Sequence, residues 1–176
     1  MNTALAAKNT LLELNQRLVE QYKAKHPIAD IVKQRSAFID NLLQNAWKKC
    51  HLDLYPMSLI AVGGYGRGEL LPYSDVDLLF LIEQDEVCQN TQAKLSELIT
   101  YLWDAGLEIG HSVRTVSQTI EQGKADITIA TNLIEARFLC GNTPLFDELY
   151  QRIRQDDFWP SADFYNAKKE EQTLRH

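Results

Sequence analysis

The stretch from residue 57 to residue 83 constrains this chain more than any other, because it places two apolar runs around a polar, glycine-rich loop. Residues 59–62 form the first run, which stops at a glycine pair at residues 63–64, and residues 78–82 form the second. Both runs have strand length, and five consecutive apolar residues indicate a strand that is covered on both faces. The stretch therefore predicts a strand, a loop and a second strand.

Two acidic residues, Asp75 and Asp77, stand where the second strand begins. Side chains alternate across a strand, so residues two apart point the same way, about 6–7 Å from each other. Two carboxylates at that spacing repel each other unless a cation lies between them. Mg²⁺ suits this role, because it takes oxygen ligands and is commonly held by one or two carboxylates together with substrate phosphates.

The glycine pair, Gly63 and Gly64, supplies a complementary feature. Glycine lacks a Cβ atom, so the backbone can adopt a positive φ, approach a ligand closely and turn its N–H groups toward a phosphate oxygen. The loop thus offers donors for a triphosphate, and the aspartates offer ligands for its metal ion.

Composition excludes several classes of function. With 176 residues, 45% of them hydrophobic, the chain can form one domain with a real core. Its net charge of −6 argues against nucleic-acid binding, which normally needs a basic face. No apolar run is long enough to span a membrane, no signal-peptide pattern is present, and the three cysteines show no disulfide or metal-ligand spacing. We expect a cytoplasmic protein.

Hydrophobic periodicity gives the remaining elements. Helices are expected over residues 4–25, 28–49 (bent near 34–36), 89–105, 115–124, 126–139, 145–153 and 164–176. Residues 107–115 alternate apolar and polar side chains, which is typical of a strand. In the second helix, four charged residues are expected on a solvated face: Arg35, Asp40, Lys48 and Lys49.

Several strings in the chain resemble a known family. A glycine pair followed about ten residues later by Asp75-x-Asp77 is similar to the signature of the DNA polymerase beta-like nucleotidyltransferase superfamily. The longer strings AVGGYGRGEL, SDVDLL, GHSVRT, ATNLIEAR and FWPS resemble the bacterial PII uridylyltransferase/uridylyl-removing enzymes. The resemblance covers roughly residues 36–176. Tyr65 follows the glycine pair, where many members of the superfamily carry serine.

The resemblance implies an α+β fold, with a small mixed sheet, helices on one side of it, and flanking N- and C-terminal helices. The expected division is a helical segment 1–55, a nucleotidyltransferase core 56–145 and a C-terminal helical segment 146–176. In the resembling enzymes the chain continues into more helix, a phosphohydrolase domain and two regulatory domains, so this chain is expected to be a truncated module.

The expected site has Asp75 and Asp77 as catalytic and metal-binding residues and the amides of Gly63 and Gly64 as ligands of the triphosphate. By resemblance, a strand beside the Asp-x-Asp strand carries a third carboxylate. Glu108 is the acidic residue available there, as second-metal ligand or base, unless it is a surface carboxylate.

Four further residues have alternative roles. Tyr65 is either a nucleotide contact or part of the loop packing. Arg67 binds phosphate or pairs with Glu69 or Asp75, and Ser74 caps the strand entry or contacts phosphate. Arg114 is expected to support the two aspartates rather than to touch substrate.

The function implied by the resemblance is Mg²⁺-dependent transfer of UMP from UTP to a tyrosine of the PII nitrogen-signalling protein, with release of pyrophosphate. Three alternatives stay open. The chain could transfer AMP to glutamine synthetase or to a small molecule. It could bind nucleotide or PII without turnover, or use a sugar nucleotide as glycosyltransferases with an Asp-x-Asp site do.

Overall fold

A four-stranded sheet forms the centre of the molecule, and its strands lie in the order β3-β2-β1-β4. The structure, a computed structural model, describes residues 3–175. Strand β1 runs antiparallel to both β2 and β4, whereas β2 and β3 are parallel, so the sheet is mixed. The strands are β1 (Met57–Ala61), β2 (Val76–Ile82), β3 (Ile109–Thr115) and β4 (Arg137–Gly141).

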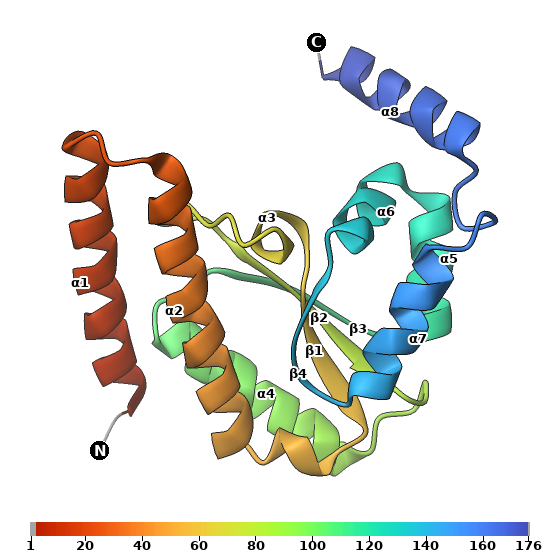
Figure 1. Cartoon of the computed structure of the whole chain (residues 1–176). Helices are drawn as coiled ribbons and strands as arrows, with labels where there is room; N and C mark the ends of the chain where they lie inside the picture. The colour runs from red at the N-terminus through yellow and green to blue at the C-terminus, as the bar shows by residue number, and fades with distance from the viewer. Residues whose placement is uncertain (1–2, 176) are drawn as a thin grey trace.

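Helices precede, interrupt and follow the sheet (Figure 1). They are α1 (Thr3–Lys23), α2 (Ile28–Lys49), the 3-10 turn η1 (Leu52–Leu54), α3 (Gly63–Gly66), α4 (Gln89–Asp104), α5 (Val116–Ala125), α6 (Ile127–Ile134), α7 (Thr143–Ile153) and α8 (Ser161–Leu174). This arrangement confirms the predicted α+β class, a mixed sheet with flanking helices. None of the helices in residues 3–175 is long and apolar enough to cross a bilayer.

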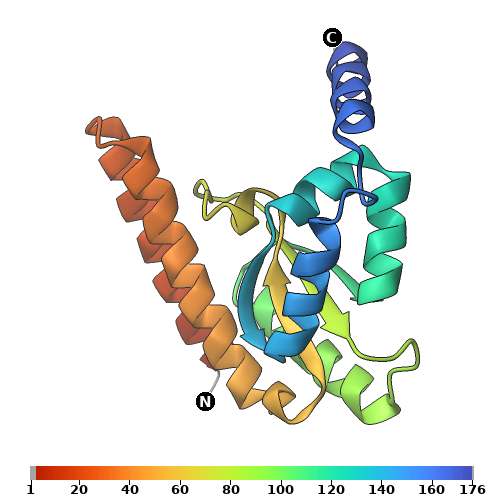
Figure 2. The ribbon, with the colours of Figure 1, turned by 45° about the vertical axis from the view of Figure 1, so that its right-hand side comes forward.

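Both faces of the sheet are covered. Leu59 and Phe80 belong to a core that includes residues of α2 and α4. Leu79, which points to the other side of β2, packs with residues of α5, α6 and α7. Figure 2 shows the hairpin of α1 and α2 on one side of the sheet and α7 on the other. The unbroken apolar run of β2 therefore predicted correctly that both faces of this strand are covered. The expectation that helices lie on only one side of the sheet was wrong.

The second predicted helix is correct in extent but not in detail. Helix α2 is continuous from Ile28 to Lys49, with no break near residues 34–36. Arg35 is 2% exposed, and its guanidinium donates to Asn15 Oδ1 (3.2 Å) and to the carbonyl of Ser74 (3.2 Å). The prediction that Arg35 lies on a solvated face was wrong, because α1 and the loop before β2 both cover it.

The predicted helix over residues 126–139 was also wrong in its second half. Helix α6 ends at Ile134, and residues 137–141 form β4 along the outer edge of β1. The division into segments 1–55, 56–145 and 146–176 stays a prediction about domains. Helices α2 and α7, which lie outside the middle segment or cross its boundary, both contribute to the cores on the sheet.

Candidate active site

Asp77 lies near the start of β2, next to the end of β1 and the start of β3. The carbonyl of Asp77 accepts from the N–H of Val62 (3.1 Å), which ties the end of β1 to the start of β2. Strand alternation places the Asp77 side chain on the face of Leu79, the face covered by α5, α6 and α7. The carboxylate therefore projects beside the turn that leaves β1.

Two glycines flank the Asp77 carboxylate. Gly63 has φ of +62°, and a Cβ atom there would lie 3.2 Å from Asp77 Oδ2. Gly110 is the β3 residue paired with Asp77, and a Cβ atom there would lie 2.7 Å from Oδ1. A side chain at Gly110 would collide with the carboxylate. The structure thus brings Gly63 and Asp77 together, and it adds Gly110, a glycine of an alternating strand that was not predicted as a site residue.

The charge of Asp75 acts on the Asp77 carboxylate. Partial burial raises the pKa of Asp77 above its usual range, and the charge of Asp75 raises it further. Asp75 precedes the strand and is exposed. Desolvation and a neighbouring like charge both disfavour the ionised form, and a bound cation would relieve both effects. The pair therefore fits a divalent ion with oxygen ligands.

The glycine turn forms the short helix α3, which starts beside Asp77. The N–H of Gly66 donates to the carbonyl of Val62 (3.1 Å), and that of Arg67 donates to Gly63 (3.2 Å). The first amides of a helix have no acceptor within it. Among the described residues, the N–H groups of Gly63 and Gly64 have no backbone acceptor, and their role as phosphate donors stays a prediction.

The side chain of Tyr65 is buried beneath this turn, next to α2 and β4. Its side chain is 1% exposed, and its hydroxyl donates to Asp40 of α2. Arg137 of β4 donates to both oxygens of Asp40 (2.7 and 3.1 Å), lies over the Tyr65 ring and donates to the carbonyls of Tyr65 (3.1 Å) and Gly66 (3.3 Å). Burial is the main reason that the pKa of Tyr65 is raised. Asp40 is thus bonded within the fold and is not on a solvated face.

Arg67 and Ser74 are both engaged by neighbouring groups. Arg67 is exposed and forms ion pairs with Glu69 (2.9 Å) and Glu135 (2.5 Å). The hydroxyl of Ser74 donates to the carbonyl of Leu71 (2.7 Å). Of the roles considered for Arg67, the structure therefore shows the pair with Glu69. For Ser74 it shows a local hydrogen bond, and the capping and phosphate roles stay predictions.

Glu108 precedes β3 and has an exposed side chain. Its carbonyl accepts from the N–H of Val76 (2.8 Å), which extends the parallel pairing of β2 and β3 by one bond. In the described part of the chain, no group of three or more His, Cys, Asp or Glu side chains is placed to hold a metal ion. The role of Glu108 as a third carboxylate stays a prediction.

A cavity of about 290 Å³ opens beside Asp77 and runs between the sheet and helices α5 and α6. Arg114 lines it but pairs across the sheet with Leu81, four residues beyond Asp77. Among the described residues, no acidic group lies within 4.0 Å of the Arg114 guanidinium. The prediction that Arg114 supports the two aspartates was wrong, because strand register separates them.

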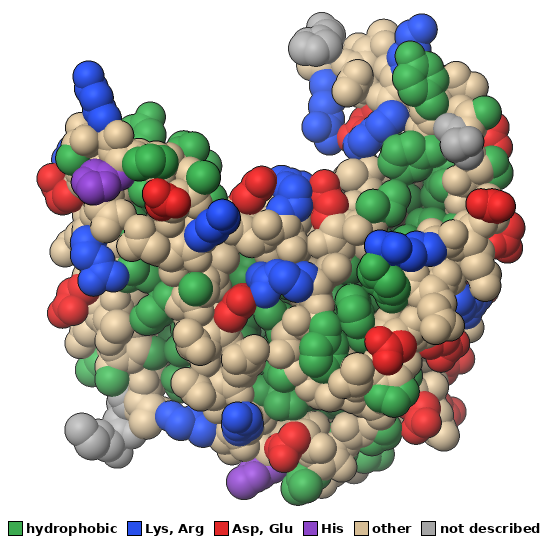
Figure 3. All heavy atoms as spheres, viewed as in Figure 1, with side chains coloured by type: hydrophobic (Ala, Val, Ile, Leu, Met, Phe, Trp, Pro, Cys, Tyr) green, Lys and Arg blue, Asp and Glu red, His purple; other side chains and the backbone are tan. Residues whose placement is uncertain are grey.

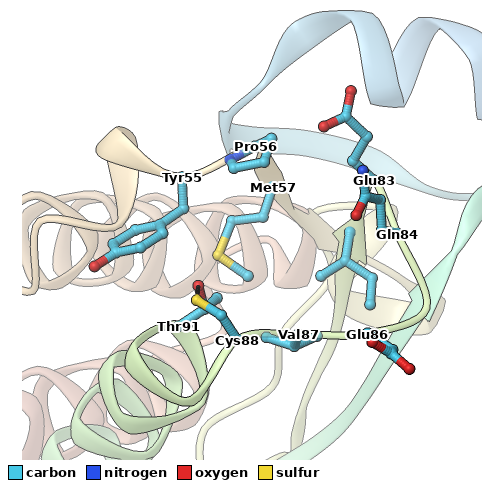
Figure 4. Close-up of a pocket in the computed structure, with 10 residues that line it drawn as sticks. Tyr55, Pro56, Met57, Glu83, Gln84, Glu86, Val87, Cys88 and Thr91 are labelled. Atoms are coloured by element: carbon cyan, nitrogen blue, oxygen red, sulfur yellow. Dashed lines mark hydrogen bonds between the residues drawn. The ribbon is translucent and has the colours of Figure 1, made fainter.

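A second cavity, of about 230 Å³, lies at the opposite end of β2 and is lined by residues including Tyr55, Met57, Glu83 and Cys88 (Figure 4). Cys88 lies beside Thr91, and their side chains are 3.1 Å apart. The hydrogen bond from Thr91 lowers the pKa of the Cys88 thiol. Since Met57 pairs with Ile82, this cavity is separated from Asp77 by the length of the strand.

Comparison with known proteins agrees with this geometry. Residues 43–130, which include β1, α3, β2 and β3, match the family described as "Nucleotidyltransferase domain". This chain belongs to the nucleotidyltransferase domain family. The matched residues include the glycine pair and the two aspartates, so the family is defined over the same region as the site.

The nucleotidyltransferase domain is also similar to part of several curated proteins named "Bifunctional uridylyltransferase/uridylyl-removing enzyme". The relative from Photobacterium profundum is 49% identical over 170 residues, which is 96% of this chain and 19% of that protein. The relatives from Vibrio cholerae (47%) and Haemophilus influenzae strain PittEE (46%) match 99% of the chain and 20% of their own length. The chain therefore spans about a fifth of the length of these relatives.

Proposed function

We propose that this nucleotidyltransferase domain transfers UMP from UTP to a tyrosine hydroxyl of a PII signalling protein in a Mg²⁺-dependent reaction. The observation that carries the proposal is the setting of Asp77, whose carboxylate lies between Gly63 and Gly110 and is coupled to Asp75. A carboxylate pair beside a glycine turn offers both the ligands of a metal ion and the donors for the phosphates that accompany it.

Asp75 and Asp77 would hold the metal ion, and the amides of Gly63 and Gly64 would receive the β- and γ-phosphates. Bound Mg²⁺ would supply charge neutralisation at the phosphates and orientation of the reacting oxygens. Tyr65 would hold the glycine turn in place through its packing. Arg67 would lie at the exposed edge of the site, paired with Glu69 and Glu135. Ser74 would hold the loop that leads to Asp75.

In the proposed reaction, the oxygen of the acceptor hydroxyl forms a bond to the α-phosphorus. The bond from that phosphorus to the oxygen that bridges to the β-phosphate breaks, and pyrophosphate leaves with the electron pair. The hydroxyl proton passes to a base, for which Glu108 is the proposed carboxylate. Such reactions depend mainly on positioning and on stabilisation of charge.

The names of the relatives support uridylyl transfer, and the resemblance supports PII as acceptor. The surface offers room for a protein acceptor: in Figure 3 a hollow separates the α1–α2 hairpin from α8, and acidic and basic side chains lie at its floor. Figure 1 shows α3 at the same place. The three free thiols fit a protein of the reducing cytoplasm.

The test is a transfer assay with PII and each of the four nucleoside triphosphates labelled at the α-phosphate, in Mg²⁺ and in EDTA. The proposal predicts label on PII from UTP alone, dependence on Mg²⁺, and loss of transfer in Asp77→Asn. Full activity of Asp77→Asn would overturn the metal assignment. Label transferred from ATP to glutamine synthetase would instead identify an adenylyltransferase, and calorimetric binding of Mg-UTP without any transfer would identify a binding module.

A further inference from the structure

The cavity beside Asp77 contains polar side chains that the proposed chemistry does not use. Arg114 and Ser112 project into it from β3, and Asn132 projects from α6. None of these three side chains makes a hydrogen bond within the described part of the chain, although all three are half-buried. Their donors and acceptors are therefore free to bond to a ligand or to solvent in the cavity.

The other half-buried or buried arginines of the sheet and α2 are engaged. Arg35 donates to Asn15 and to the carbonyl of Ser74, and Arg137 forms a two-pronged pair with Asp40. Arg114 differs from both, because its guanidinium faces the cavity without an acidic partner among residues 3–175. Its five donors are therefore free to recognise something in the cavity.

Strand register sets the position of this guanidinium relative to the metal ligands. Ser112 pairs with Leu79 and Arg114 with Leu81, so they lie two and four residues along the strand from the Asp77–Gly110 pair. Four residues of strand correspond to about 13 Å. At the near end, Asn132 Oδ1 lies 3.5 Å from where a Cβ atom of Gly63 would be. The cavity thus leads from the phosphate end of the site toward Arg114.

Apolar side chains form the walls between these two ends. Leu79 of β2 and Ile129 and Leu133 of α6 line the cavity. Thr119, which also lines it, is already engaged, because its hydroxyl donates to the carbonyl of Thr115 (2.7 Å). An apolar slot with a few polar groups at its ends is typical of a site for a flat organic ligand.

We propose that this cavity holds the nucleobase of the substrate and that Arg114, with Ser112, selects a base that presents carbonyl oxygens. This inference rests on the proposed function, because it needs the α-phosphate at Asp77. Arginine donates and never accepts, so it favours the carbonyl oxygen at position 4 of uracil and opposes the amino group that cytosine carries there. Arg114 is thus a specificity-determining residue, and Asp77 and Gly63 read only the phosphates.

The experiment measures binding and transfer for UTP and CTP in the full chain with Mg²⁺, comparing the unmodified protein with Arg114→Met and Arg114→Lys. Removing a hydrogen bond from a charged group is expected to lower the preference for UTP over CTP by about 10- to 100-fold in Arg114→Met. Arg114→Lys should restore part of the preference. Arg17→Met, at an exposed position of α1, controls for the loss of one positive charge.

A second ligand separates this inference from the proposed function. Inorganic tripolyphosphate with Mg²⁺ should bind equally to the unmodified protein and to Arg114→Met, and it should bind poorly to Asp77→Asn. If tripolyphosphate behaves in this way but the UTP/CTP ratio is unchanged in Arg114→Met, the base assignment is overturned and the phosphate site stands. A change confined to the KM for the acceptor protein would also overturn it, by assigning the cavity to the acceptor. If neither nucleotide nor tripolyphosphate binds the unmodified protein, both proposals fail.

Discussion

At the scale of single residues, Asp77 is placed where its charge opposes folding in the absence of a cation. Burial and Asp75 both raise its pKa, so the folded state binds the proton more tightly than the unfolded state does. The stability contributed by protonation is present at low pH and is lost as the pH rises through the raised pKa. At neutral pH without metal, the charged side chain is therefore destabilising.

This predicts that Asp77→Asn raises the melting temperature of the metal-free protein at neutral pH by roughly 1–3 °C, since 1 kcal/mol corresponds to about 2–4 °C in a chain of this size. The same variant should lose the additional stabilisation that Mg-UTP gives the unmodified protein. Thermal unfolding with and without Mg-UTP measures both effects. A variant that melts lower than the parent in EDTA would contradict the electrostatic account.

Gly110 carries a second prediction at this scale. A Cβ atom there would lie 2.7 Å from Asp77 Oδ1, so Gly110→Ala must displace the carboxylate. Misplacement of a ligand by a fraction of an ångström to an ångström is expected to reduce kcat/KM by about 10- to 100-fold. Val113→Ala, at an exposed position of the same strand, should leave kcat/KM unchanged. Equal activity of the two variants would show that the close approach at Gly110 is unimportant.

At the scale of elements, the group formed by Asp40, Tyr65 and Arg137 joins α2, α3 and β4. Arg137→Met should leave Asp40 with only its hydrogen bond from Tyr65 and remove the guanidinium bonds to the carbonyls of Tyr65 and Gly66. For a half-exposed pair, the expected loss of stability is about 1–3 kcal/mol, between the values for surface and buried pairs. Chemical denaturation measures this loss.

Hydrogen exchange shows which residues are destabilised in Arg137→Met. In Arg137→Met, the amides of residues 63–67 should exchange faster, while those in the middle of β2 keep their protection. Tyr65→Phe removes only the hydroxyl and should cost about 1 kcal/mol with a smaller effect on exchange. Uniformly faster exchange over the whole sheet would show a global rather than a local role for Arg137.

The same elements show what the sequence could and could not predict. The glycine turn and the third strand follow from local patterns, because a positive φ and a strand period are read within a few residues. The parallel pairing of that strand with β2 comes from the structure. Strand β4 does not follow from local patterns, because its residues continue the apolar spacing of α6 and form a strand only by pairing with β1. The burial of Arg35 and Tyr65 likewise depends on partners 20 or more residues away in the chain.

At the scale of the whole molecule, the α1–α2 hairpin is part of the hydrophobic core and not a peripheral addition. Trp47 is 1% exposed and stacks on Phe80 of β2 at 6.5 Å between ring centroids. A chain that lacks residues 1–49 would expose the part of β1 and β2 that α2 covers, so we expect it to lose cooperative unfolding. A chain that lacks residues 166–176 should keep its transition, because in α8 no described side chain is buried. Circular dichroism during thermal unfolding compares the two.

The contacts that fix the glycine turn also determine the kinetics of nucleotide binding. Gly66 packs so closely that a Cβ atom there would lie 2.3 Å from the carbonyl of Glu135, and the turn is tied to Val62 on one side and to Arg137 on the other. A binding loop that is fixed at both ends already has its binding conformation before the nucleotide arrives. Stopped-flow association of Mg-UTP should therefore show a single phase whose rate rises linearly with concentration, without the plateau that a slow rearrangement would impose.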